Sequence, residues 1–252
     1  MRIATYNIWN SQNGMPFREN HISIELKSID ADIICLQEVR DRNMAENIAE
    51  SIKYNYCYFE SYHNESEGLA IISKIPFINT ISLFNKANTI ICTFEINGKK
   101  LCIANIHLPW DSPLNREKQI VETVSSLENE PYDYVLLAGD FNCSETSDVN
   151  RFLIGECLLN GKESKYIWYD LALSNAERNN TRPEFTLNFT ENPRFKNNTI
   201  EINSRVDRIM LRNTYPADFP VLTDCRIFGQ KIYNETELAA SDHYGLIAEL
   251  EL

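Results

Sequence analysis

Several side chains that can bind metal ions or transfer protons stand at the ends of short apolar runs of the sequence. They are Asn7, Glu38, His107, Asp140, Asn142, Asp207, Asp242 and His243. Asp207, Asp242 and His243 stand at the start of a run, and the others stand at the end of one. If the runs are strands of a sheet, their ends deliver these polar side chains to a common rim.

These residue types are the ones that hydrolysis of a phosphoester requires. Carboxylate and amide oxygens suit Mg²⁺, which keeps several water molecules and uses few protein ligands. A histidine can take the proton from an attacking water molecule if a carboxylate fixes its tautomer. An amide can donate a hydrogen bond to a phosphoryl oxygen as negative charge develops on it. The residues therefore favour a metal-dependent phosphoester hydrolase.

Each of these residues also has a purely structural interpretation. A glutamate that follows a strand, such as Glu38, is usually solvated. Asp140 and Asn142 could form a turn, because both residue types favour turns. His107 could be an ordinary surface or interior histidine, and Asp242 with His243 could cap the start of a strand. Their occurrence together in one chain, each at the end of an apolar run, favours the catalytic interpretation.

Strands and helices must alternate along the chain to position these residues. Apolar runs predict strands at 3–8, 33–37, 54–62, 69–73, 90–96, 101–108, 134–138, 206–211 and 244–252. Apolar side chains at helical spacing predict three helices, with the buried faces Ile22, Leu26, Ile29; Met44, Ile48, Ile52; and Ile120, Val124, Leu127. Asn97-Gly98 predicts a hairpin turn. Residues 155–200 are rich in asparagine and poorly periodic, which predicts loops.

So many strands with interspersed helices indicate two sheets packed face to face and covered outside by helices. The sequence has 252 residues, of which 43% are hydrophobic, and it shows no linker-like or low-complexity stretch. These features favour one domain that covers residues 1–252.

The charge of the chain argues against tight binding of long duplex DNA. The formal net charge is −12, and the isoelectric point is near 4.9. Proteins that hold many duplex phosphates usually carry a basic stripe. The arginines between residues 178 and 208 do not form one, because glutamates and Asp207 are interspersed with them.

The cysteines and the N-terminus bear on the compartment. The chain has seven cysteines and no C-x-x-C pair, so neither a disulfide framework nor a zinc site is indicated. Cys35, Cys92 and Cys102 lie inside apolar runs, where we expect them to pack as small hydrophobic residues. Neither a signal peptide nor an apolar span is visible. We therefore expect a cytoplasmic protein without stable membrane association.

The ordered motifs resemble those of the endonuclease/exonuclease/phosphatase superfamily from residue 3 to about the C-terminus. They are Thr5-Tyr6-Asn7-Ile8-Trp9, Leu36-Gln37-Glu38-Val39, Asn105-Ile106-His107-Leu108, Gly139-Asp140-Phe141-Asn142, Val206-Asp207-Arg208-Ile209 and Ser241-Asp242-His243-Tyr244-Gly245. The resemblance implies an α/β fold, a four-layer αββα sandwich in which two mixed β-sheets pack face to face and are flanked by helices. It also implies Mg²⁺ or Mn²⁺ as the cofactor.

The resemblance also implies a role for each residue. Asn7, Glu38 and Asp242 would hold the metal ion. Asp140 and Asn142 would engage the phosphate and the nucleophile. His243 would be the general base, oriented by Asp207, and His107 would contact the phosphate or assist the leaving group. Glu67, which precedes the run 68–73, resembles the carboxylate that the family pairs with this first histidine. Alternatively, Glu67 lies in a hairpin turn.

The family includes nucleases, tyrosyl-DNA phosphodiesterases, inositol phosphatases and sphingomyelinases. Asp207-Arg208-Ile209 and the final Ser-Asp-His-Tyr-Gly motif resemble the tyrosyl-DNA phosphodiesterases and small nucleases. We therefore expect a monomeric phosphodiesterase whose substrate is nucleic acid, with action on ends, short strands or adducts. A phosphatase or a sphingomyelinase-like phospholipase is the alternative. A non-catalytic interaction domain of the same fold is disfavoured, because none of the expected groups is missing.

Overall fold

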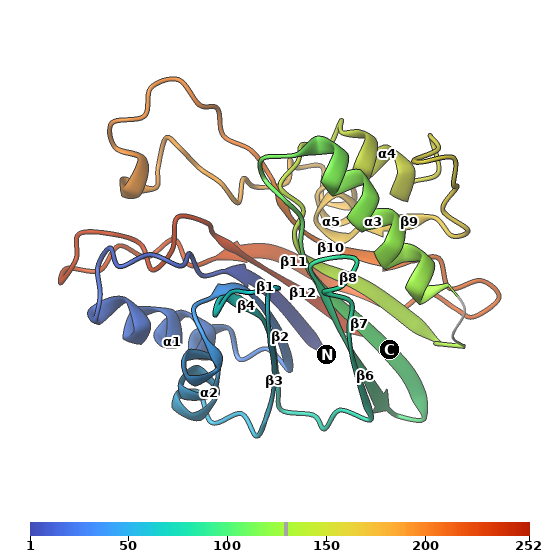
Figure 1. Ribbon diagram of the computed structural model, residues 1–252, viewed down its shortest axis with the longest axis horizontal. Coiled ribbons are helices and arrows are strands. Elements are labelled where there is room, and N and C mark those ends of the chain that lie inside the picture. Colours follow the sequence, from blue (N-terminus) through green and yellow to red (C-terminus); the bar gives the residue numbers. More distant parts are fainter. Residues whose placement is uncertain (129–130) are drawn as a thin grey trace.

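In the computed structural model, which describes residues 1–128 and 131–252, the strands form two six-stranded sheets (Figure 1). The first sheet has the order β11-β12-β1-β2-β4-β3. Its strands are β1 (Arg2–Asn7), β2 (Ile33–Val39), β3 (Tyr56–Ser61), β4 (Gly68–Ser73), β11 (Val221–Phe228) and β12 (Gly245–Glu251). The second sheet has the order β5-β6-β7-β8-β10-β9. Its strands are β5 (Asn79–Ser82), β6 (Thr89–Ile96), β7 (Lys99–His107), β8 (Tyr134–Asp140), β9 (Trp168–Asp170) and β10 (Asp207–Arg212).

Helices cover the outer faces of both sheets. Figure 1 shows α1 and α2 outside the first sheet and α3 and α4 outside the second. The helices are α1 (Phe17–Ile29), α2 (Arg42–Ser51), α3 (Pro113–Leu127), α4 (Asp148–Leu153) and α5 (Leu171–Arg178), with a 3₁₀ turn η1 at Pro193–Phe195. Within the described residues, no helix combines the length and the apolar character needed to cross a membrane.

The hydrophobic core has three parts, one between each pair of neighbouring layers. Ile3, Ile33 and Ile103 belong to the part between the sheets. A second part joins α1 and α2 to the first sheet, and a third joins α3 and α4 to the second sheet. Because an apolar side chain on each sheet face needs a covering layer, this arrangement gives four layers. The αββα sandwich predicted from the sequence is confirmed.

The helical faces expected from the sequence are the buried ones. Ile22, Leu26 and Ile29 of α1 are all buried against the first sheet. Helix α3 begins where the sequence indicates, because Pro113 occupies its first turn and the Ser112 hydroxyl accepts a hydrogen bond from the Asn115 amide. The β6–β7 hairpin turns at Asn97-Gly98, where both residues have positive φ angles of 53° and 74°.

The prediction of loops for residues 155–200 is wrong in part. This stretch contains β9 and α5, and Leu171 and Ala172 of α5 belong to the core between the sheets. The sequence prediction also missed β5 and β11, which occupy the outer positions of their sheets. The remaining strands begin and end within a few residues of the expected positions. Cys35, Cys92 and Cys102 are fully buried, as expected.

Candidate functional site at the rim of the sheets

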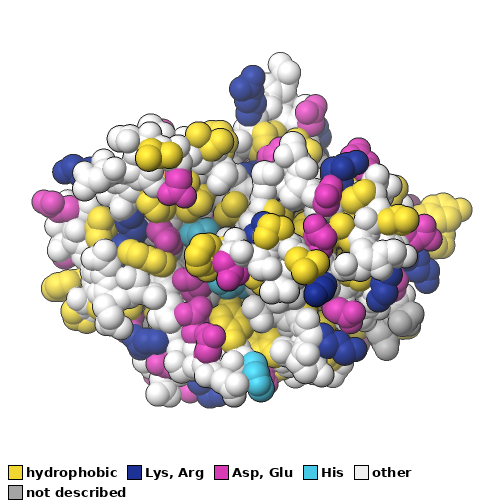
Figure 2. Space-filling model, turned by 45° about the horizontal axis from the view of Figure 1, so that its top comes forward, with side chains coloured by type: hydrophobic (Ala, Val, Ile, Leu, Met, Phe, Trp, Pro, Cys, Tyr) yellow, Lys and Arg dark blue, Asp and Glu magenta, His cyan; other side chains and the backbone are white. Residues whose placement is uncertain are grey.

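The strand register brings the polar strand ends to one rim of the molecule. In the first sheet, β1 runs parallel to β2, so Asn7 lies beside Gln37 and close to Glu38. In the second sheet, β7 runs parallel to β8 and β10 runs antiparallel to it, so Asp140 pairs with His107 on one side and with Asp207 on the other. Figure 2 shows the face of the molecule that is hollowed near its centre, where histidine and acidic side chains gather.

Asn7 connects the two sheets at this rim. Its Nδ2 donates hydrogen bonds to Glu38 Oε1 and to Asp140 Oδ2, each at 3.0 Å. Its Oδ1 accepts a hydrogen bond from the Trp9 amide at 3.0 Å. Trp9, Glu38 and Asn142 all have positive φ angles, of 54°, 56° and 47°. Such angles are uncommon outside glycine. The surrounding structure holds the chain in these sharp turns, which place functional side chains at the strand ends.

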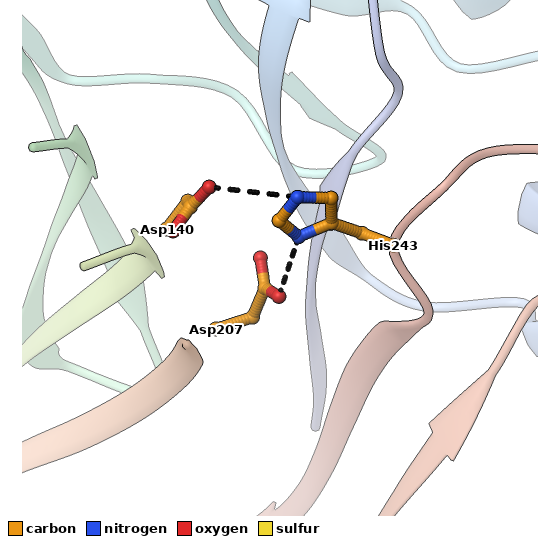
Figure 3. Close-up of side chains that lie close together, drawn as sticks. All are labelled: Asp140, Asp207 and His243. Atoms are coloured by element: carbon orange, nitrogen blue, oxygen red, sulfur yellow. Dashed lines mark hydrogen bonds and ion pairs between the residues drawn. The ribbon is translucent and has the colours of Figure 1, made fainter. Parts of the chain in front are cut away.

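Asp207 and His243 form a buried pair (Figure 3). The Nδ1 of His243 lies 2.9 Å from Asp207 Oδ2, and its Nε2 lies 3.9 Å from Asp140 Oδ2. Burial by itself lowers the pKa of His243, but the charges of Asp207 and Asp140 outweigh it and hold that pKa well above its usual value. The carboxylate therefore fixes the imidazole with Nδ1–H toward Asp207, which leaves Nε2 facing the rim.

His107 has a partner that the sequence did not predict. Its Nδ1 lies 2.7 Å from the hydroxyl of Tyr62, and Glu67 accepts a hydrogen bond from the Asn10 side chain instead. Within residues 1–128 and 131–252, no hydrogen bond or ion pair joins Glu67 to His107. The two side chains therefore form no direct hydrogen bond in this structure, although the charge of His107 does act on the Glu67 carboxyl. The phenol reaches the ring because Tyr62 follows β3 directly and packs under the rim.

The turn after β8 holds Asn142 in place. The Asn142 amide donates to Asp140 Oδ1 at 2.8 Å, and its Nδ2 donates to the Leu108 carbonyl at 2.9 Å. Gly139 makes the close approach of β7 and β8 possible, because a Cβ there would lie 2.0 Å from the Ile106 carbonyl oxygen. Asp140 and Asn142 therefore do form a turn, and that turn presents both side chains at the rim.

The acidic groups of the rim fit a hard divalent cation. The Asp242 carboxyl has its pKa raised by burial and also by the charge of Glu38, so the two carboxylates repel each other. Among the described residues, neither one forms an ion pair with a lysine or arginine. Carboxylates of this kind, without a lysine or arginine partner, are suited to Mg²⁺ or Mn²⁺. The side-chain oxygen of Asn7 accepts one hydrogen bond, from the Trp9 amide, and keeps a second lone pair that a cation could use.

A second cluster of ionisable side chains, formed by Asp140, Asp207 and His243, lies close by and is suited to a different task. The ligand atoms of Asp140, Asp207 and His243 all lie within 4.8 Å of one another. The hydrogen bond between His243 and Asp207 already uses one atom of each. This cluster is consequently better suited to hold and move a proton than to bind an ion.

Two arginines, the buried Arg18 and the partly buried Arg194, supply positive charge beside the rim. The guanidinium carbons of Arg18 and Arg194 lie 5.3 Å and 4.3 Å from the centre of the Trp9 ring. Burial lowers the pKa of Arg194 to about 10, while the charge of Asp242 acts in the opposite direction. The acidic chain thus has local positive charge near the predicted metal ligands. Arg194 is one of the arginines between residues 178 and 208 noted in the sequence, whereas Arg18 was not expected at the rim.

Comparisons with known proteins agree with this architecture. A family model described as "Endonuclease/Exonuclease/phosphatase family" matches residues 4–243. Among curated proteins, the chain is 27% identical to a probable CCR4-Not complex 3'-5'-exoribonuclease subunit Ccr4 from Vairimorpha ceranae. That alignment covers 60% of this chain and 41% of the relative, so the chain spans well under half of the length of that protein.

The solved structures show the same fold at low sequence identity. D. rerio TDP2 complexed with single strand DNA product has a TM-score of 0.79 and 17% identity, with 100% of this chain and 99% of that chain covered. C. elegans TDP2 has a TM-score of 0.75 and 20% identity, with 100% and 75% covered. Beta toxin from Staphylococcus aureus has a TM-score of 0.72 and 16% identity, with 99% of each chain covered.

Proposed function

This chain belongs to the Endonuclease/Exonuclease/phosphatase family, and on that premise we propose that it is a Mg²⁺- or Mn²⁺-dependent phosphodiesterase. Its substrates are nucleic acid ends, short strands or adducts. The observation that supports the activity most directly is the convergence at one rim of a buried Asp207–His243 pair with Asp140. The carboxylates of Glu38 and Asp242, which have no lysine or arginine partner among the described residues, lie close by.

The residues of the rim divide the chemistry among them. Nε2 of His243 takes a proton from the attacking water molecule, and the charge of Asp207 stabilises the imidazolium that results. Asn142 and His107 contact the phosphoryl oxygens, whose negative charge increases in the transition state. Asn7, Glu38 and Asp242 would hold the divalent ion, which supplies positive charge to the phosphate when it is bound.

The similar proteins and one exposed side chain support a nucleic acid substrate. The curated relative is named as an exoribonuclease, and the D. rerio structure contains a single strand DNA product. Trp110 lies three residues after His107 in the chain. The loop that carries Trp110 is held in place because Arg116 donates hydrogen bonds to the Pro109 and Trp110 carbonyls. The Trp110 side chain is 78% exposed. An exposed indole of this kind can stack on an unpaired base.

The net charge of −12 supports short or single-stranded substrates over long duplexes. A cytoplasmic location is also part of the proposal, and the odd number of cysteines without a C-x-x-C pair in the sequence supports it. The monomeric state remains a prediction.

A substrate panel tests the proposed function. Turnover should be measured with Mg²⁺ or Mn²⁺ on single- and double-stranded DNA, RNA, abasic DNA, 5′-tyrosyl DNA, inositol phosphates and sphingomyelin. We expect turnover on single-stranded or end-modified nucleic acid. Turnover only on inositol phosphates or sphingomyelin would favour the alternative, and no turnover on any substrate would favour a non-catalytic domain.

Two matched variants exclude a contaminating nuclease. His243→Ala should abolish the turnover that the panel detects. His63→Ala should retain it, because His63 is an exposed histidine outside the rim.

A further inference from the structure

The two histidines of the rim have partners of opposite hydrogen-bonding character. The Asp207 carboxylate can only accept a hydrogen bond from Nδ1 of His243. The Tyr62 hydroxyl, which lies 2.7 Å from Nδ1 of His107, can either donate or accept. The direction of this hydrogen bond decides which nitrogen of His107 carries the hydrogen, and therefore what His107 can offer to a substrate.

The surroundings of Tyr62 hold its hydroxyl in place. Its side chain is only 8% exposed, and its ring packs 5.5 Å from that of Phe84. Its backbone amide donates to the Glu67 carbonyl at 2.7 Å, and its carbonyl accepts from the Glu65 amide at 3.1 Å. Both the ring and the backbone are thus fixed, so the phenol cannot turn away from His107.

The surroundings of the hydroxyl favour the phenol as the donor in this contact. Burial, together with the charge of Glu67, raises the pKa of Tyr62 well above its usual value, so the hydroxyl keeps its hydrogen. Within the described part of the chain, His107 is the one hydrogen-bond partner of that hydroxyl. If the hydroxyl accepted from Nδ1–H instead, its own hydrogen would be buried without an acceptor, which is unfavourable.

The other ring nitrogen faces the centre of the rim. Nε2 of His107 lies 3.9 Å from Glu38 Oε1 and 3.8 Å from Asp140 Oδ2. Both distances exceed the usual 2.7–3.2 Å of an N–H···O hydrogen bond. Among the described residues, Nε2 therefore points between the predicted metal ligand and the turn after β8 without a partner at hydrogen-bond distance.

We propose that Tyr62 is a positioning residue that holds the imidazole of His107 with its hydrogen on Nε2 whenever the ring is neutral, so that His107 donates a hydrogen bond to the phosphoryl group and leaves proton abstraction to His243. This proposal deepens the proposed function and rests on it for the identity of the phosphoryl ligand. The two rings differ in the tautomer that their partners select, and because the Asp207 and Asp140 charges raise the pKa of His243, that ring acts as a base only in its neutral form, whose share grows with pH. Nε2 of His107 donates to the substrate, whereas Nε2 of His243 accepts a proton from water.

The tautomer of His107 can be measured without any substrate. The chain has four histidines, so their ring nitrogens can be assigned by ¹⁵N NMR with single His variants. At a pH where the ring is neutral, we expect a non-protonated, hydrogen-bonded Nδ1 and a protonated Nε2 for His107. Tyr62→Phe should shift the Nδ1 resonance, because the phenol no longer donates to it. Tyr58→Phe is the matched control, since Tyr58 lies in β3 and its hydroxyl faces Glu60.

Turnover provides the second readout. Tyr62→Phe should lower kcat about tenfold and change KM less, because a misaligned donor weakens transition-state contacts more than substrate binding. Tyr58→Phe should leave both constants unchanged. A protonated Nδ1 in the wild-type protein would overturn the proposal, and so would an unchanged Nδ1 resonance in Tyr62→Phe. The wild-type spectrum decides the tautomer even if Tyr62→Phe does not fold. An absence of turnover in the wild-type protein would instead contradict the proposed function.

Discussion

Replacing Asp207 with asparagine should lower kcat by about a hundred- to a thousandfold while the fold stays intact. Asp207 is fully buried, and its Oδ2 lies 2.9 Å from Nδ1 of His243. Asparagine has nearly the same shape, so the change removes the charge and little packing. It also allows the amide to present an N–H to His243, which would select the wrong tautomer.

The magnitude follows from the charge pair. When His243 takes a proton, its positive charge forms beside the Asp207 carboxylate. Two unit charges about 4 Å apart, at an effective dielectric constant of about 20, attract each other by about 4 kcal/mol. Because about 1.4 kcal/mol corresponds to a tenfold change in rate, the loss of this attraction accounts for at most about a thousandfold. Burial raises the pKa of the Asp207 carboxyl, so the neutral amide should not destabilise the protein.

Single-turnover and steady-state kinetics on the best substrate of the panel provide the assay. His243→Ala should lower kcat to a similar degree, and the double variant should be little slower than either single variant, because the two residues act as one unit. Asp224→Asn is the matched control, since Asp224 pairs with Arg226 at the surface and should have no effect. Losses that multiply in the double variant would refute the reasoning, as would an Asp207→Asn variant of full activity.

Three further predictions concern the rest of the chain. Cys143→Ser should remain active, because Cys143 is buried against the second sheet and its carbonyl, not its thiol, accepts a hydrogen bond from Arg208; activity lost without unfolding would mean that the thiol takes part. A plot of log kcat/KM against log salt concentration should be shallow, because each phosphate contact adds about 0.9 to the slope and we expect about two contacts or fewer. A steep slope with a preference for long duplex would reveal a basic surface. Burial lowers the pKa of His21, so its neutral form stabilises the fold above the usual histidine pKa, and this stability is lost as the pH falls below about 6.5. Thermal unfolding of His21→Gln should therefore depend less on pH over this range than that of the wild-type protein, and equal profiles would contradict this assignment.

The sequence predicted the elements whose signal is local. Strands such as β2 and β8 are continuous apolar runs, and their polar ends indicate the rim directly. Helix α1 has its buried residues at helical spacing. The family resemblance implies the order in which the strands pair. That order was enough to predict that Asp140, Asp207 and His243 lie close together, as they do.

The missed elements have weak local signals. Strand β9 has three residues, and β11, in an outer position of its sheet, mixes exposed residues such as Val221 and Thr223 with buried ones. The buried residues of α5 are Leu171, Ala172 and Ala176, and alanine contributes little to an apolar pattern. In each case the packing against neighbouring strands decides the structure, and the sequence alone does not display that packing.

The partner of His107 was missed for a different reason. Tyr62 lies 45 positions away, and an aromatic residue after a strand is most simply interpreted as part of the core. Glu67 had the more familiar residue type for a histidine partner, but its carboxylate turns toward Asn10. Side-chain direction within a turn depends on contacts that only the folded structure provides.

The central claim is that a divalent ion held at Glu38 is required for phosphodiester hydrolysis. The most direct measurement is turnover of a single-stranded or end-modified DNA substrate after EDTA treatment and again after addition of Mg²⁺ or Mn²⁺. It should be made on the wild-type protein, Glu38→Ala and Glu46→Ala, where Glu46 is an exposed glutamate of α2. We predict that EDTA abolishes turnover, and that the metal restores it in the wild type and in Glu46→Ala but not in folded Glu38→Ala. Turnover that persists in EDTA, or full activity of Glu38→Ala, would contradict the account.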